Sequence, residues 1–132
     1  MDSIDKLSLI ILKDRKVLYT RSFNKDAWFN PGGKRIEDET DEQALVREIK
    51  EELDVEVVPS SIKYYGTFEA QAHGKPEGVM VRITCYTGSY TGEIKPSSEI
   101  EEVKYFSYLD RELASVTGQL ILDDLYNKKL ID

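Results

Sequence analysis

The chain opens with two apolar runs, residues 7–12 and 16–23, which the polar residues 13–15 separate. Two such runs joined by a short polar stretch are typical of a β-hairpin. The first run is so densely apolar that we expect a central strand covered on both faces. The sequence therefore predicts a hairpin whose first strand lies inside a sheet.

The spacing of apolar residues changes to a helical period at residues 40–53. Thr40 can cap the first turn, and Gln43, three residues later, completes a capping box. No Gly or Pro interrupts the run. Its apolar residues recur every three to four positions, so that one face can be buried; they are Leu45, Val46, Ile49 and Leu53.

A second hairpin is predicted downstream of this helix. Residues 62–72 form one strand, and in residues 79–87 apolar and polar side chains alternate with the period of two that a strand requires. The polar stretch between them contains His73, which we interpret as a loop residue rather than a catalytic one.

The last third of the chain predicts one more strand and a terminal helix. After a loop, residues 99–106 read as a strand and residues 108–113 as a short helical turn. Thr117 can cap a final helix that ends near Lys128. The side of this helix that we expect to be buried consists of Leu120, Ile121, Leu125 and Tyr126.

Length and composition limit the class of protein. With 132 residues the chain can bury a real core but is too short for two domains, so we expect one domain, 1–132. The single Cys85 excludes an internal disulfide framework and fits a reducing compartment. No apolar run is long enough to span a membrane and the start resembles no signal peptide, so we expect a cytoplasmic protein.

The net charge of −7 is concentrated in one segment. Residues 37–56 contain ten acidic and two basic side chains, so the rest of the chain carries a net charge of +1. This distribution argues against binding to duplex nucleic acid, which needs a basic surface. A polyanionic substrate remains compatible with it if a metal ion accompanies the substrate.

Three glutamates of the predicted helix, Glu48, Glu51 and Glu52, share one face because they are spaced at i, i+3 and i+4. A cluster of carboxylates suits Mg²⁺, which takes oxygen ligands and keeps several waters. A solvated acidic helix face is the alternative interpretation, and the charge pattern alone does not choose between them.

The spacing around these glutamates resembles the signature of the Nudix hydrolases. That signature is a glycine, a glutamate, and then R-E-aliphatic-x-E-E-x-G-aliphatic. The chain departs from it where Asp54 replaces the second glycine, at a position that ends the helix and favours the left-handed conformation. The matching residues are Gly33, Glu39, Arg47, Glu48, Ile49, Glu51, Glu52 and Val55.

The resemblance implies the Nudix fold, an α/β/α sandwich with a mixed β-sheet. It also implies an enzyme that cleaves the pyrophosphate linkage of a nucleoside diphosphate derivative by attack of water on phosphorus. The implied cofactor is Mg²⁺, for which Mn²⁺ is a possible substitute. The protein would mainly position the substrate and neutralise its charge.

The resemblance also assigns roles to individual residues. The catalytic residues would be Glu48, Glu52 and Glu99, with the general base either Glu48 or Glu99. Within the motif, Gly33, Glu39 and Arg47 would be structural, and Arg47 would pair with Glu39 or Glu51. The metal ligands would be the Gly32 carbonyl, Glu48, Glu51, Glu52 and Glu99, with Glu102 the second choice for the last position.

Several residues outside the motif are candidates for binding the substrate. Arg21 could hold the base or phosphates, or could be a surface arginine at a strand end. Lys34 could orient phosphates or lie in solvent. Trp28 reads as a core residue. The base pocket would be formed by Phe29 and Asn30 before the glycine loop and by Gln119 in the last helix.

The substrate that we expect is a (d)NTP or an oxidised (d)NTP, cleaved to NMP and pyrophosphate. The chain lacks the tyrosine of dinucleoside-polyphosphate hydrolases, since Gln71, Ala72 and His73 stand there, and Ala70 replaces the proline of ADP-ribose enzymes. The alternatives are a Nudix hydrolase for nucleotide sugars or dinucleotides, a catalytically silent nucleotide-binding Nudix domain, and an acidic interaction module. We expect no duplex nucleic acid or membrane as partner, and a monomer or a homodimer.

Overall fold

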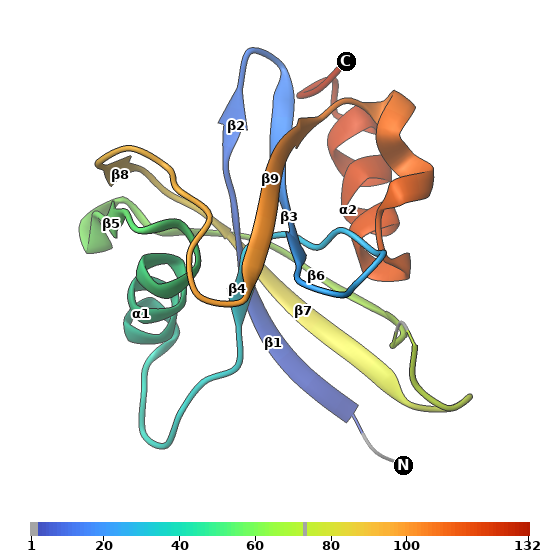
Figure 1. Ribbon diagram of the computed structural model, residues 1–132, viewed down its shortest axis with the longest axis horizontal. Coiled ribbons are helices and arrows are strands. Elements are labelled where there is room, and N and C mark those ends of the chain that lie inside the picture. The colour runs from blue at the N-terminus through green and yellow to red at the C-terminus, as the bar shows by residue number, and fades with distance from the viewer. Residues whose placement is uncertain (1–2, 73) are drawn as a thin grey trace.

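The computed structural model describes residues 3–72 and 74–132 (Figure 1). His73, interpreted above as a loop residue, lies outside the described residues. The elements follow the expected order of strands, helix, strands and terminal helix. No helix of the described part of the chain is long and apolar enough to cross a membrane.

The main sheet is mixed and has the strand order β4-β1-β7-β6. β1 is a central strand, antiparallel to β4 on one side and parallel to β7 on the other. β6 and β7 form the antiparallel hairpin that the sequence predicts. The bounds are β1 Ser3–Ile10, β4 Gly32–Gly33, β6 Lys63–Gln71 and β7 Met80–Thr87.

Smaller sheets complete the β structure. One has the order β2-β3-β9 and the other pairs β5 with β8. Two short 3₁₀ helices lie in the connections, η1 between β5 and β6 and η2 between β9 and α2. The bounds are β2 Leu12–Lys13, β3 Lys16–Ser22, β5 Glu56–Val57, β8 Tyr90–Thr91, β9 Ile100–Phe106, η1 Pro59–Ser61 and η2 Tyr108–Leu113.

The predicted first hairpin is correct only in part. β3 pairs with the two-residue strand β2 across a turn in which Asp14 and Arg15 both have positive φ, as a tight hairpin turn requires. The long apolar run, however, belongs to β1, which pairs with β4 and β7 instead. These partners are distant in sequence, so local spacing could not identify them.

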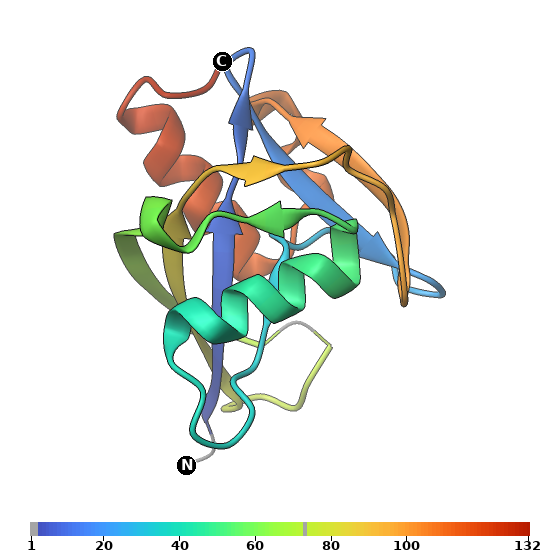
Figure 2. The ribbon, with the colours of Figure 1, turned by 90° about the vertical axis from the view of Figure 1, so that its left-hand side faces the viewer.

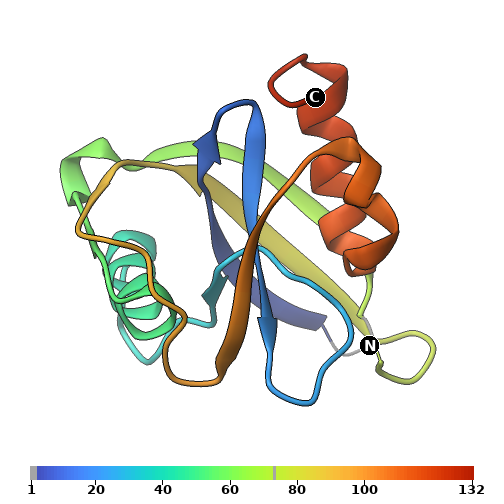
Figure 3. The same cartoon turned by 45° about the horizontal axis from the view of Figure 1, so that its top comes forward.

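The two helices cover opposite sides of the strands, as Figures 1 and 3 show. In Figure 2, α1 (Asp41–Leu53) crosses in front of the strands, and α2 (Val116–Asn127) lies behind them. Two separate clusters of buried side chains fill the layers between helices and strands. This arrangement confirms the expected α/β/α sandwich with a mixed sheet.

Strand alternation divides the apolar side chains between the two layers. In β1, Leu7 and Leu9 pack with the buried face of α1, whereas Ile10 packs on the side of α2. In β3, Leu18 faces α1 and its neighbour Tyr19 faces α2. Central strands therefore read as continuous apolar runs because both of their faces are covered.

The helix α1 forms as the sequence predicts. The Thr40 hydroxyl accepts a hydrogen bond from the Gln43 backbone N–H, and the Gln43 side chain accepts one from the Thr40 backbone N–H, which completes the capping box. Asp54 ends the helix with φ 58° and ψ 36°, the expected left-handed conformation. Three apolar positions of the predicted stripe are fully buried, namely Leu45, Ile49 and Leu53.

The helix α2 differs from the prediction at its start and on its buried side. Ser115, not Thr117, is the cap, because its hydroxyl accepts from the Gly118 N–H while Thr117 already lies inside the helix. Tyr126 is exposed and stacks on Tyr108 of η2 at 4.2 Å between ring centroids. Leu120 is only partly buried. The fully buried side chains are Ile121, Leu122 and Leu125.

Candidate active site

The candidate site lies where α1 passes the edge strand β4, which consists of two glycines. A Cβ on Gly33 would stand 2.4 Å from the Glu48 Oε2 atom, and a Cβ on Gly32 would stand 2.0 Å from the Leu7 carbonyl oxygen. Gly32 also has a φ of +148°, which side chains rarely adopt. The glycines therefore leave the room in which the carboxylates of α1 reach past the sheet edge.

Glu52 is the most buried carboxylate of the site, with 7% of its surface exposed. Its Oε1 atom accepts a hydrogen bond of 2.9 Å from the Gly32 backbone N–H. Burial, aided by the charges of Glu48 and Glu99, raises the pKa of Glu52 to about 8, although the Gly32 hydrogen bond and Lys6 act in the opposite direction. An unpaired negative charge is thus costly here and favours a cationic ligand.

Glu48 and Glu99 contribute carboxylates to the same cavity as Glu52. Burial raises the pKa of Glu48, and the Arg47 guanidinium offsets part of this rise. Glu99 comes from the loop directly before β9. This loop lies beside α1, because the Ser97 N–H donates to the Glu52 carbonyl oxygen at 3.0 Å. Helix and loop therefore bring together three of the predicted carboxylates.

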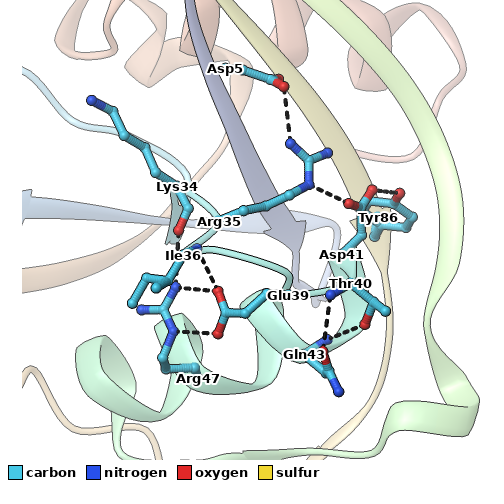
Figure 4. Close-up of polar contacts among 10 residues, drawn as sticks. All are labelled: Asp5, Lys34, Arg35, Ile36, Glu39, Thr40, Asp41, Gln43, Arg47 and Tyr86. Atoms are coloured by element: carbon cyan, nitrogen blue, oxygen red, sulfur yellow. Dashed lines mark hydrogen bonds and ion pairs between the residues drawn. The ribbon is translucent and has the colours of Figure 1, made fainter.

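Arg47 ties the loop before α1 to the helix, as Figure 4 shows. Its Nε and Nη2 atoms donate to the two Glu39 carboxylate oxygens at 2.7 and 2.9 Å, and Nη2 also donates to the Lys34 carbonyl oxygen. Glu39 Oε1 in turn accepts from the Ile36 N–H. The Arg47 guanidinium holds the pKa of Glu39 at about 2. Of the two partners expected for Arg47, Glu39 makes the bidentate contact.

A second set of contacts in Figure 4 fixes the other end of this loop. Arg35 donates to Asp5 of β1 and to Asp41 at the start of α1. The Tyr86 hydroxyl of β7 donates to the other oxygen of Asp41. Sequence reasoning missed this network because its members come from three elements that only the fold brings together.

The carboxylates line one side of a cavity of about 710 Å³. Four lysines line the same cavity: Lys6, Lys25, Lys34 and Lys75. Among the residues that the structure describes, none of these four ammonium groups forms a hydrogen bond or an ion pair within 4.0 Å. Of the four, only Lys34 is predicted from the sequence as a substrate-binding residue. The signal for Lys6 was a lysine directly before the apolar run 7–12.

The remaining wall of the cavity is suited to a flat polar group. Phe29 and Asn30 line it from the loop before β4, and Ser115 and Thr117 line it from the start of α2. Both polar atoms of the Asn30 amide are buried, and neither forms a hydrogen bond of ordinary geometry. The amide is nevertheless close to the Tyr19 hydroxyl: burial raises the pKa of Tyr19, and the Asn30 amide offsets part of this rise. A buried amide in this condition is available to a ligand.

Three predicted site residues lie elsewhere. Arg21 does not line the cavity but forms ion pairs with Glu101 and Glu102 of β9, and its side chain is 18% exposed. The Gln119 side chain donates to the Ala114 carbonyl oxygen and is also absent from the cavity wall. Glu51 is 54% exposed and outside the cavity. Trp28 is 8% exposed and belongs to the core.

The carboxylates that line the cavity fit a hard divalent cation. Burial, and to a lesser extent the charges of Glu48 and Glu99, raise the pKa of Glu52, and a bound cation would offset this cost of its negative charge. As the side chains stand, no group of three or more Asp, Glu, His or Cys residues within 3–72 and 74–132 is arranged to hold a metal ion. Mg²⁺ commonly uses only one or two carboxylates together with waters and substrate phosphates.

Comparison with known proteins gives the family. Residues 6–121 match the family model of the NUDIX domain. The RNA pyrophosphohydrolase of Hydrogenovibrio crunogenus is 38% identical over 58 residues, which are 44% of this chain and 34% of that relative. The match thus spans about a third of the length of the curated relative.

Solved structures agree with this assignment. A putative nudix hydrolase family member from Chromobacterium violaceum has a TM-score of 0.73 and 28% identity, covering 96% of this chain and 78% of that one. A MutT NUDIX hydrolase from Burkholderia pseudomallei has the same fold, with a TM-score of 0.77, 19% identity, and coverage of 93% of this chain and 98% of that one. Because the family model spans most of the chain, the chain belongs to the Nudix hydrolase family.

Proposed function

We propose that this protein is a Mg²⁺-dependent pyrophosphohydrolase that cleaves a (d)NTP or an oxidised (d)NTP to NMP and pyrophosphate. The observation that carries the proposal is the composition of the 710 Å³ cavity, which combines the carboxylates of Glu48, Glu52 and Glu99 with four lysines and a buried amide. A metal-bound polyphosphate complements the charges, and a base complements the amide and the Phe29 ring.

The charged groups of the cavity support a polyphosphate substrate because they do not neutralise one another. In the described part of the chain, no cavity lysine forms an ion pair with Glu48, Glu52 or Glu99. Carboxylates that hold a cation and ammonium groups that hold phosphate oxygens are both needed for such a ligand. A purely apolar small molecule would leave the cavity lysines, Glu52 and Glu99 without an ion-pair partner among the described residues, whereas Glu48 keeps Arg47.

The roles of the acidic residues follow from their positions. Glu48, Glu52 and Glu99 would hold Mg²⁺, which supplies neutralisation of phosphate charge and a lowered pKa for water. Glu52 is fixed by the Gly32 N–H, and Glu48 by Arg47, whose Nη1 donates to Glu48 Oε1 at 2.7 Å. The more exposed Glu99 is free to take a proton from water, and Glu48 is the alternative general base.

The base would be read at the end of the cavity that contains Asn30. An amide presents a donor and an acceptor together, so it can pair with the edge of a nucleobase while Phe29 supplies a flat apolar contact. Thr117 and Ser115 bring hydroxyls to the same region. We assign the polar contacts from α2 to these two residues rather than to Gln119, whose amide is occupied by Ala114.

A hydrolysis screen tests the proposal. The panel contains nucleoside triphosphates, their oxidised forms, nucleotide sugars and dinucleotides, and also 5′-triphosphorylated RNA because one relative is named an RNA pyrophosphohydrolase. Each is incubated with Mg²⁺ or with EDTA, and the products are separated. We expect NMP and pyrophosphate from triphosphates, with Mg²⁺ only.

The other outcomes identify the alternatives. Efficient cleavage of nucleotide sugars, dinucleotides or RNA ends in place of free triphosphates would reassign the substrate within the family. Binding of nucleotides without turnover would indicate a silent domain, and an acidic interaction module would neither bind nor hydrolyse them. The variant Glu52→Gln serves as the control for contaminating activity, because it keeps the shape of the side chain and removes its charge.

A further inference from the structure

Lys6 is a cation placed inside the fold rather than at its rim. It belongs to the central strand β1, where it is paired with Ile83 of β7. Strand alternation puts its side chain on the same side of the sheet as Ile10, which packs in the α2 layer, and opposite to Leu7. The lysine is partly buried at the floor of the cavity.

Among the described residues, the ammonium group of Lys6 has no acceptor for its protons. Within residues 3–72 and 74–132 it forms no hydrogen bond and no ion pair, and its one specific contact is with the ring of Phe29, 5.7 Å from Nζ to the ring centroid. Burial lowers the pKa of Lys6, and Lys34 and Lys75 lower it further. A desolvated cation beside like charges is unfavourable unless an anion joins it.

The position of Lys6 divides the cavity into two ends. On one side it lies over Phe29, next to Asn30, where we place the base. On the other side it is near enough to Glu52 and Glu48 for their charges to offset part of the lowering of its pKa by burial. A nucleotide that spans from the amide to the carboxylates therefore passes Lys6 between its base and its metal-bound phosphates.

We infer that Lys6 binds the phosphoryl group attached directly to the nucleoside, donating hydrogen bonds to its non-bridging oxygens. The inference rests on the proposed function and specifies which part of the substrate this residue contacts. Lys34 and Lys75 line the cavity as well, and they are left for the phosphates farther from the nucleoside. Charge-assisted contacts of an ammonium with phosphate are strong in such a partly desolvated place.

Binding of the two reaction products distinguishes this role from a structural one. NMP carries only the phosphoryl group that Lys6 would contact, and pyrophosphate carries only the other two. Calorimetric titration at fixed Mg²⁺ compares wild type with Lys6→Met, which keeps the apolar stem on Phe29. We expect NMP affinity to fall about 10- to 100-fold, the range for a lost hydrogen bond to a charged group, and pyrophosphate affinity to stay within twofold of wild type.

Further variants complete the experiment. Lys6→Arg keeps the charge and should recover most of the NMP affinity. Lys63→Met removes an exposed lysine of β6 outside the cavity and should change the affinity for neither product. In the absence of ligand, Lys6→Met should melt at the same temperature as wild type or higher, because it removes a charge that burial penalises. Lys6→Gln is the second uncharged variant if Lys6→Met does not fold.

The outcomes separate this inference from the proposed function. Unchanged NMP affinity in the uncharged variant, or a loss confined to pyrophosphate, would overturn the assignment even if wild type hydrolyses triphosphates. A Lys6→Met protein that melts well below wild type, with both products weakened equally, would show a structural lysine instead. If wild type cleaves no triphosphate but its NMP affinity depends on Lys6, the inference stands and the proposed reaction fails.

Discussion

The close approach of Gly33 to Glu48 gives a direct test of the site. A Cβ at residue 33 would lie 2.4 Å from Glu48 Oε2 and 2.5 Å from Glu48 Cδ, whereas ordinary contacts of a Cβ begin at 3.4 Å. The variant Gly33→Ala therefore forces the carboxylate to retreat by about 1 Å, since the backbone of β4 is held in the sheet by β1. Gly33 has no positive φ that would add backbone strain.

The expected effect is large on activity and small on stability. A displacement of about 1 Å in a reacting group costs on the order of 100-fold in rate, which is about 2.7 kcal/mol at the constant of 1.36 kcal/mol per factor of ten. The overlap falls on the end of a side chain rather than on backbone, so relief should cost about 1 kcal/mol of folding stability. The lower backbone entropy of alanine in the unfolded chain offsets about 0.4–1 kcal/mol of that cost.

The assay is kcat/KM for pyrophosphate release at saturating Mg²⁺, together with the thermal melting midpoint with and without Mg²⁺. Gly66→Ala is the matched control, because its Cβ would meet only the Phe68 ring at the ordinary distance of 3.5 Å. Gly32→Ala should instead fail to fold, since its Cβ would meet the Leu7 carbonyl oxygen. A folded Gly33→Ala protein with wild-type kcat/KM and the wild-type Mg²⁺ shift in melting would refute the reasoning.

Four more outcomes are expected. Glu52→Gln should lower kcat by orders of magnitude while the fold survives, and near wild-type turnover would remove Glu52 from the ligand set. Asp54→Gly should relieve left-handed strain and raise the melting midpoint by up to about 4 °C, as roughly 1 kcal/mol would at this size; a clear drop would mean that the ion pair of Asp54 with Lys50 dominates. Asn30→Ala should lower kcat/KM for the preferred base by about 1–3 kcal/mol and change the ranking of bases, and an equal loss on every base would contradict base reading. Arg47 depresses the pKa of Glu39 to about 2, so this pair should stabilise the fold above pH 4.5 and lose that contribution as the pH falls toward 2; a melting difference between wild type and Glu39→Gln that does not shrink on acidification would contradict it.

Sequence reasoning was most successful where structure depends on near neighbours. The capping box, the buried stripe and the left-handed end of α1 all formed as predicted, because each involves residues within about one turn of one another. The same holds for the β6-β7 hairpin, whose alternation fixes its buried face. The predicted cap of α2 was wrong, because Ser115 and Thr117 are both good capping residues. Packing against β3, where the Tyr19 hydroxyl donates to the Gly118 carbonyl oxygen, decides which one starts the helix.

Part of the site was also predicted, because two of its carboxylates are near neighbours on one helix. The spacing of Glu48 and Glu52 on one helix puts them together, and the resemblance supplied Glu99. The structure does not place Arg21 and Gln119 at the cavity, because each binds a partner that the sequence does not reveal. Arg21 pairs with glutamates of β9, and Gln119 donates to the Ala114 carbonyl oxygen. A long polar side chain goes to whichever partner the fold brings nearest.

By itself, the sequence determined the helix, its carboxylate face, the glycines that precede it and the family to which they point. These features depend on residue type and on spacing along the chain, which the backbone converts into geometry through local hydrogen bonds. Only the tertiary structure decided which carboxylate is buried, which strands neighbour β1, and that Lys6 faces the same cavity as Glu52. Burial and electrostatic coupling arise between segments that are distant in sequence, so they exist only after the sheet and both helices have packed.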